Sequence, residues 1–118
     1  MENKLDSSDP PAQKPETALR DNEVEDQFEL LVDGAPAGIL TYSIEDGDYA
    51  LNHEEIDPSF QGLGMGSQLV SLALDQIRSK GRGVLPYCPF VLSFMQRHPE
   101  YQDLVPDRHR DRFELSAG

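Results

Sequence analysis

The feature that most constrains this chain is a glycine-rich segment, Phe60-Gln61-Gly62-Leu63-Gly64-Met65-Gly66-Ser67. It follows an apolar stretch that ends near Ile56 and precedes an amphipathic stretch that runs to about Lys80. We therefore expect a strand, a tight loop and a helix in that order. Glycines leave the backbone accessible, and the first amides of a helix have no partner within it. Such a loop predicts an anion site, most often for phosphate.

Two common phosphate-binding loops do not match this segment. A P-loop requires Lys and then Ser or Thr after its last glycine, whereas Gly66 is followed by Ser67-Gln68. A dinucleotide-binding fingerprint requires a glycine where Ser67 stands, and it follows its strand directly. The segment is therefore a different anion-binding loop or, in the simpler alternative, a glycine-rich turn that only begins a helix.

Charge and cysteine content restrict the possible partners. The net charge of −12 argues against binding to nucleic acid or to anionic membranes, both of which require a basic surface. This acidity favours solubility or, alternatively, attraction of a cationic partner. The single cysteine cannot form an intramolecular disulfide, which fits a reducing compartment. With neither a signal-peptide core nor an apolar run long enough to span a bilayer, the sequence predicts a cytoplasmic protein.

The apolar pattern divides the chain into three parts. Residues 1–26 are rich in acids and prolines and poor in large apolar side chains, so we expect a disordered acidic tail. Residues 27–104 carry the regular patterns of a folded domain. Residues 105–118 are charged and are expected to form a frayed tail, with at most a turn of order around Phe113.

The folded part predicts an α/β (α+β) domain. Alternating apolar residues and the turns at Asp33-Gly34 and residues 45–48 indicate an antiparallel meander over residues 27–56. A helix follows the glycine-rich segment and ends before Gly81, a residue well suited to a helix C-terminus. Residues 83–86 read as a short strand that lies parallel to the strand over 49–56. A second helix is expected over residues 90–97, between Pro89 and Pro99.

Cys88 is a candidate functional residue because of its expected position. It lies at the carboxyl end of the parallel strand and just before a helix N-terminus, which stabilises a thiolate and lowers its pKa. The simpler alternative is a buried, unreactive cysteine that acts as a small apolar residue. Strand alternation places Leu51, His53 and Glu55 on one face, unless a bulge interrupts the strand. A metal site is not expected, because adjacent strand residues point to opposite faces.

Four segments in order resemble a small, minimal branch of the GCN5-related N-acetyltransferases that carries an active-site Cys. They are His53-Glu54-Glu55-Ile56, the loop from Gln61 to Ser67, Pro86-Tyr87-Cys88-Pro89-Phe90, and Arg97-His98-Pro99-Glu100-Tyr101. The resemblance implies the acyl-CoA N-acyltransferase fold, with a mixed, mostly antiparallel sheet and helices packed on it. It also implies that the sheet splays open between the third strand and the strand over 83–86. The pantetheine arm of acetyl-CoA or coenzyme A would lie in that gap, and its pyrophosphate on the loop.

The resemblance also assigns roles to individual residues. Cys88, His53 and Glu55 are the catalytic candidates, with Cys88 either lining the site or accepting the acetyl group before the amine does. Glu55 matches the family's acidic position, whereas His53 is chosen because an imidazole is a suitable base; the alternative for either is an ordinary surface residue. Met95 stands where many members have a catalytic Tyr, which leaves Tyr87, Tyr101 or solvent as the acid. The candidates for cofactor binding are Gln61, Gly62, Leu63, Gly64, Met65, Gly66, Ser67, Arg97 and His98.

The function expected on these grounds is acetyl transfer from acetyl-CoA to an amine. The acceptor is a protein lysine, an N-terminus or a small amine, and the protein is a monomer or a weak homodimer without a nucleic-acid or membrane partner. Two alternatives remain open: a non-catalytic module that binds CoA or acyl-CoA, favoured by the missing Tyr, and an interaction protein whose acidic tail recruits a basic partner.

Overall fold

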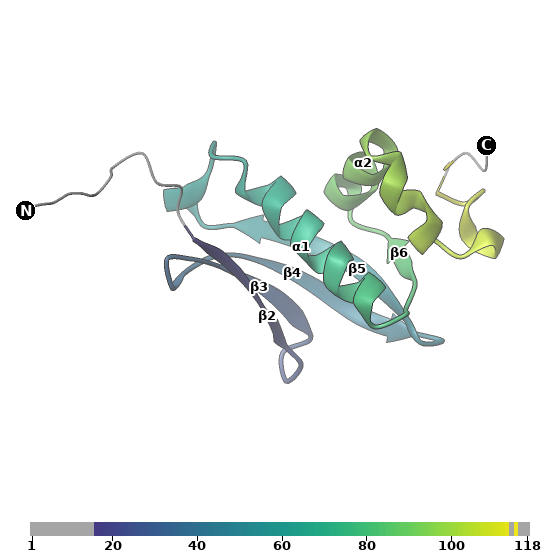
Figure 1. The fold of residues 1–118 in the computed structure, drawn as a ribbon, viewed down its shortest axis with the longest axis horizontal. Helices are drawn as coiled ribbons and strands as arrows, with labels where there is room; N and C mark the ends of the chain where they lie inside the picture. The colour runs from purple at the N-terminus through teal and green to yellow at the C-terminus, as the bar shows by residue number, and fades with distance from the viewer. Residues whose placement is uncertain (1–15, 114, 116–118) are drawn as a thin grey trace, which may run out of the picture.

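The computed structural model describes residues 16–113 and 115, and it contains one five-stranded sheet with two helices packed on it (Figure 1). The strand order is β2-β3-β4-β5-β6, antiparallel except for the parallel pair β5–β6. This arrangement confirms the expected fold class. The elements are β2 (Thr17–Asn22), β3 (Gln27–Val32), β4 (Ala35–Glu45), β5 (Asp48–Ile56), η1 (Pro58–Phe60), α1 (Met65–Ser79), β6 (Val84–Pro86), α2 (Pro89–Arg97), η2 (Pro99–Leu104) and η3 (Asp107–His109).

Strands β5 and β6 are paired over only part of their length. Tyr49 to Leu51 pair with Val84 to Pro86, while β5 continues to Ile56 without a partner on that side among the described residues. The backbone N–H of Cys88 donates to the Leu51 carbonyl (2.8 Å), and Pro89 then begins α2. The sheet therefore opens beyond Leu51, at the place where the sequence predicted it to splay.

Helix α1 covers one face of the sheet. A Cβ added to Gly38 would lie 3.5 Å from the Leu69 side chain, which identifies the face of β4 that contacts this helix. The apolar stripe of α1 buries Leu69, Val70, Ala73, Leu74 and Ile77 against the sheet. The helix ends at Ser79, and Gly81 follows with φ of +70°, as expected for a helix terminus closed by glycine. Among the described residues no helix has the length and apolarity needed to cross a membrane.

A bulge in β5 reverses the expected alternation of its side chains. Thr41 lies opposite His53 but Tyr42 lies opposite Leu51, so Asn52 is an extra residue in β5. Leu51 therefore does not share a face with His53, and that prediction is wrong. Beyond the bulge, residue 54 lies opposite Leu40, on the face that carries α1.

The expectation that residues 1–26 form a disordered tail is wrong for the second half of that segment. Residues 1–15 lie outside the described part of the chain, but Thr17–Asn22 form the edge strand β2. The Tyr42 hydroxyl donates to Asp21 (2.6 Å), and the Lys80 ammonium donates to the other oxygen of that carboxylate (3.2 Å). An edge strand needs only one face against the core, so few apolar residues are sufficient to hold it.

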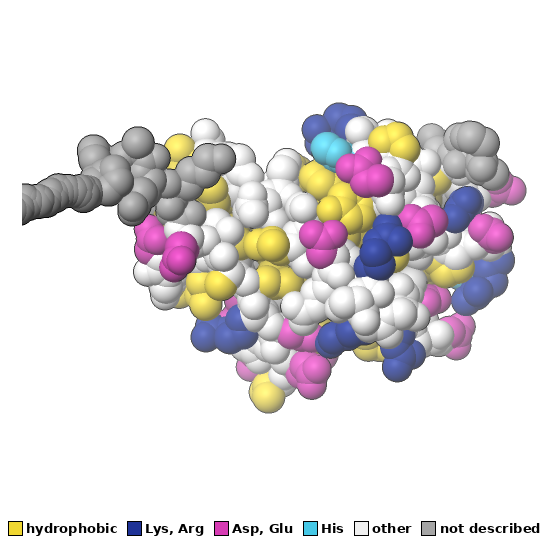
Figure 2. Space-filling model, in the orientation of Figure 1, with side chains coloured by type: hydrophobic (Ala, Val, Ile, Leu, Met, Phe, Trp, Pro, Cys, Tyr) yellow, Lys and Arg dark blue, Asp and Glu magenta, His cyan; other side chains and the backbone are white. Residues whose placement is uncertain are grey.

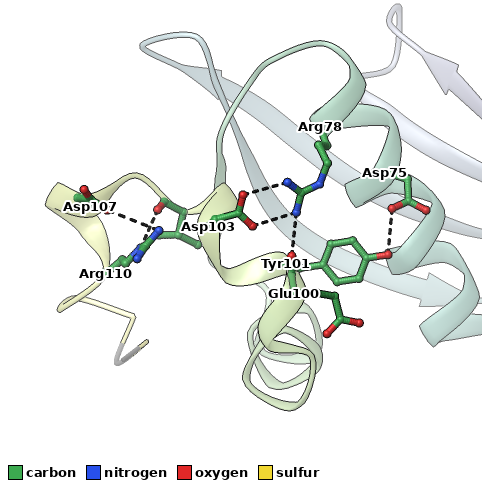
Figure 3. Close-up of polar contacts among 8 residues, drawn as sticks. Asp75, Arg78, Glu100, Tyr101, Asp103, Asp107 and Arg110 are labelled. Carbon is green, nitrogen blue, oxygen red and sulfur yellow. Dashed lines mark hydrogen bonds and ion pairs between the residues drawn. The ribbon is translucent and has the colours of Figure 1, made fainter. Parts of the chain in front are cut away.

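The expected frayed C-terminus is also wrong over the residues that the structure describes. Val105, Phe113 and Leu115 are buried, η2 packs against α2, and Arg108 of η3 pairs with Asp48 of β5 (3.5 Å). Figure 3 shows how η2 is attached: Arg78 donates to both carboxylate oxygens of Asp103 (2.9 Å each) and to the Glu100 carbonyl. These contacts join residues that are far apart in the sequence, so the local sequence pattern does not predict them.

We predict that deleting residues 1–26 destabilises the protein, whereas deleting residues 1–15 does not. The longer deletion removes β2 and leaves the Tyr42 hydroxyl without its carboxylate partner, which alone costs about 1–3 kcal/mol. Urea unfolding of the two shortened proteins measures the difference. Equal unfolding free energies would show that β2 contributes nothing to the fold.

Candidate functional site

A cleft of about 420 Å³ lies where the end of β5 meets the first turns of α1 and α2. In Figure 2 the surface is hollowed between the beginning of α1 and α2. The lining comes from β5, the glycine-rich loop and one aromatic residue of α2: Glu54, Ile56, Phe60, Gln61, Gly62, Gly64, Met65, Gly66, Ser67 and Phe90. Most of the predicted anion loop therefore faces one hollow.

Two glycines give the loop its shape. Gly62 and Gly64 have φ of +80° and +76°, in the left-handed region that other residues rarely adopt. Gly64 is the N-cap of α1 and has no side chain with which to bind the first amides of that helix. Gln61 closes the loop from the other side, because its side-chain amide donates to the Ile56 carbonyl (3.2 Å).

The backbone N–H groups from Gly62 to Ser67 donate no hydrogen bond to any described residue. They include the first amides of α1, which carry the positive end of the helix dipole. A cleft lined by free donors at a helix N-terminus is suited to a phosphate or pyrophosphate group. From Glu54 to Ile77 the sequence has no Lys or Arg, so these amides are the donors that this part of the chain offers to an anion.

Gly66 is required for a different reason, which is the space around it. A Cβ at this position would lie 3.0 Å from the Glu54 carboxylate and 3.0 Å from the Phe90 ring. Strand β5, helix α1 and helix α2 therefore meet at Gly66, and a side chain there would require the Glu54 or Phe90 side chain to shift by a few tenths of an ångström.

Glu54 is the titratable side chain that faces the cleft, although the sequence interpretation assigned chemistry to its neighbours. One of its carboxylate oxygens, Oε2, is buried and has no hydrogen-bond partner among the residues that the structure describes. Burial raises the pKa of the Glu54 carboxyl to about 7. A signal for its orientation was present in the run Tyr49-Ala50-Leu51, which breaks the apolar-polar alternation just before the bulge.

Cys88 lies at the point where β5 and β6 separate. It is the N-cap of α2, it is 4% exposed, and it is tied to Leu51 through its backbone N–H. The expected position at the end of the parallel strand is confirmed. The burial is also what the unreactive alternative requires, so the position by itself does not decide the role of the thiol.

His53 and Glu55 lie together on the opposite face of β5 from the cleft. The His53 Nε2 atom is 3.1 Å from the Glu55 carboxylate, and both side chains are exposed. Glu55 lines a second cavity, of about 410 Å³, between the ends of β2 to β5. The structure thus brings these two catalytic candidates to each other but not to the glycine-rich loop.

The other candidates for cofactor binding, Leu63, Arg97 and His98, do not line the cleft. The Leu63 side chain is 62% exposed and points out of the loop. Arg97 and His98 follow at the far end of α2, about 10 to 12 Å along the helix axis from Phe90. The His98 ring stacks on Phe94 (4.1 Å between centroids). On the face of the molecule shown in Figure 2, the basic side chains are interspersed with acidic ones and do not form a separate basic patch.

Met95, which stands where the catalytic Tyr is expected, is fully buried. The hydroxyls of its two expected substitutes, Tyr101 and Tyr87, contact charged side chains outside the cleft. The Tyr101 hydroxyl donates to Asp75 (2.9 Å), as Figure 3 shows, and the Tyr87 hydroxyl lies 3.4 Å from Glu45 and 3.0 Å from Arg112. Within the part of the chain that the structure describes, no three His, Cys, Asp or Glu side chains are grouped to hold a metal ion.

Comparison with known proteins agrees with this geometry. A family model described as GCN5-related N-acetyl-transferase matches residues 27–104, about two-thirds of the chain. The match covers the meander from β3 onward, the loop, both helices and η2. A search of curated proteins gave no match to this sequence.

We predict that Glu54→Gln stabilises the protein at neutral and alkaline pH. The carboxyl titrates near 4.5 when unfolded and near 7 when folded, so the folded state loses stability as the pH rises between these values. Above pH 7 the variant should be more stable by on the order of 1–2 kcal/mol, after allowance for partial solvent screening. Below pH 4.5 the two proteins should not differ. Thermal unfolding from pH 4 to 8 measures this, and a difference that does not change with pH would contradict the burial of the charge.

Proposed function

The chain belongs to the GCN5-related N-acetyltransferase family, and from this premise we propose that it transfers an acetyl group from acetyl-CoA to an amine. The observation that carries the proposal is the row of free backbone amides from Gly62 to Ser67 along the cleft. The residues present fit the ligand, because these amides suit a pyrophosphate and the walls beyond them are apolar. Acetyl-CoA would supply the activated acetyl thioester.

The opening between β5 and β6 suggests where the reaction takes place. An arm extending from the loop along the unpaired part of β5 would end near Leu51 and Cys88, where the strands separate. His53 and Glu55 lie on the other face of the same strand segment. An amine that approached from that face would meet an imidazole able to take its proton, with Glu55 holding the ring.

The acceptor is proposed to be an exposed amine, such as a protein lysine, an N-terminus or a small amine. Strands β3 and β4 are joined directly at Asp33-Gly34, so no helix is inserted there to enclose an acceptor. Both helices pack on the opposite face from His53 (Figure 1). The acidic character of the chain would attract such a cationic acceptor.

Direct attack of the amine is the proposed route, and an acetylated Cys88 is the alternative route. In direct attack, Cys88 would line the site, and the amine nitrogen would form its bond to the acetyl carbon as the bond from that carbon to the CoA sulfur breaks; His53 would take the amine proton and CoA would leave. In the alternative, the Cys88 thiolate would first accept the acetyl group and release CoA, and the amine would then displace Cys88 as the bond from the acetyl carbon to Sγ breaks.

A second candidate function is non-catalytic binding of CoA or acyl-CoA. The specific observation in its favour is that Met95, which the resemblance places where many family members have a catalytic Tyr, is fully buried. Turnover with a panel of primary amines separates this candidate from the enzyme, because both bind the cofactor and only the enzyme releases free CoA.

We predict that Gly64→Val abolishes measurable acetyl-CoA binding. The left-handed backbone at Gly64 disfavours a β-branched residue, and the change redirects the first amides of α1. Gly81→Val is the matched control, because Gly81 has a similar φ and equally open surroundings at the other end of α1. Calorimetric titration of both proteins is the measurement. Loss of binding in both variants, or in neither, would contradict the assignment of the loop.

We predict that Cys88→Ala lowers kcat by roughly 3- to 10-fold and changes the KM for acetyl-CoA little, because in direct attack the thiol only lines the reacting end of the site; a loss of roughly 100-fold or more would instead support the acetyl-Cys88 route. Steady-state kinetics with the best amine of the panel measures both constants, and intact-mass analysis after mixing with acetyl-CoA alone detects any acetylated Cys88. An unchanged kcat would remove Cys88 from the mechanism.

A further inference from the structure

The Glu54 side chain lines the same cleft as a row of unsatisfied backbone donors. Its Oε2 atom is buried and has no hydrogen-bond partner among the described residues, and the amides from Gly62 to Ser67 do not donate to it. The other residues that line the cleft do not titrate in the physiological range. Whatever anion the amides bind must therefore share an apolar-walled space with this carboxyl group.

Within the described part of the chain, no nearby cation compensates a negative charge on Glu54. Helix α1 has no charged residue before Asp75, and α2 has none before Arg97 at its far end. Strand β4 presents Leu40 opposite Glu54. In the loop, the Asp57 carboxylate accepts from the Ser59 N–H and lines the second cavity, on the other side of the sheet.

The remaining charged neighbours are His53 and Glu55, which point to the opposite face of β5. An ionised Glu54 and a bound phosphate would therefore repel each other in a medium that screens charge poorly. A protonated Glu54 is neutral, so this repulsion disappears, and the group becomes a hydrogen-bond donor.

We infer that the cleft is a proton-linked anion site, in which the loop binds the pyrophosphate of a CoA molecule together with one proton on Glu54. The inference rests on the proposed function and adds its regulation. Binding consumes a proton from solution and fills the vacant position on the carboxyl group. The bound complex is favoured at low pH and released as the pH rises.

The position of Glu54 beside the bound anion means that affinity falls as the pH rises. The burial of Glu54 determines the pH interval over which this happens. Because burial brings the Glu54 pKa to about 7, the free protein changes from mostly protonated at pH 6 to mostly ionised at pH 8. If only the protonated form binds, the dissociation constant rises roughly tenfold over this interval. Cofactor occupancy would then respond to pH in the physiological range.

The test is calorimetric titration with dephospho-CoA at pH 6, 7 and 8. This probe keeps the pyrophosphate, which stays ionised throughout, and lacks the terminal phosphate monoester, whose own ionisation near pH 6 would confuse the result. Buffers with different ionisation enthalpies report the protons taken up at pH 7. The proteins compared are wild type, Glu54→Gln, and the control Glu25→Gln, which makes the same change at an exposed residue in the turn between β2 and β3.

We expect roughly tenfold weaker binding at pH 8 than at pH 6, with about half a proton taken up at pH 7, for wild type and Glu25→Gln. Glu54→Gln should bind with little pH dependence and no proton uptake. Binding whose pH dependence survives in Glu54→Gln, or pH-independent binding by wild type, would overturn this inference and leave the proposed function standing. Absence of binding by all three proteins at every pH would overturn both.

Discussion

The structure depends on a loop that leaves the backbone donors at the start of α1 free. Gly62 and Gly64 adopt left-handed backbone angles there, and no side chain caps the helix. Free amides at a helix N-terminus are stable on a surface because water can satisfy them, and a phosphate satisfies them better. Gly66 then allows β5, α1 and α2 to meet closely enough to form walls around the donors.

The second constraint is the unequal length of β5 and β6. Pairing stops at Leu51, while β5 continues and carries side chains on both of its faces. Helix α2 begins at that point with Cys88 as its N-cap, so the opening has a thiol at its narrow end. The bulge at Asn52 then decides which acidic side chain faces the cleft and which faces the open side of the sheet. One irregular residue thus separates Glu54 from the pair formed by His53 and Glu55.

Local signals in the sequence were sufficient for the centre of the fold. The glycine-rich loop, the end of α1 before Gly81 and the short parallel strand each follow from turn chemistry or apolar periodicity. Edge strand β2 and the turns after Leu104 were missed, because Asp21, Arg78 and Phe113 are held by partners far away in the sequence. The bulge was missed because pairing register is a property of two strands. The expected alternation therefore placed Glu54 on the face of β5 that carries no catalytic candidate.

The central claim is that backbone amides, and not basic side chains, hold the anion of the cofactor. The most direct measurement is amide NMR of the labelled protein with and without acetyl-CoA. The account predicts that the amide protons of residues 62–67 show the largest downfield shifts and become protected from exchange with solvent, because each gains a charged acceptor. Unmoved signals for these residues, with shifts concentrated around Arg97 and His98, would contradict it.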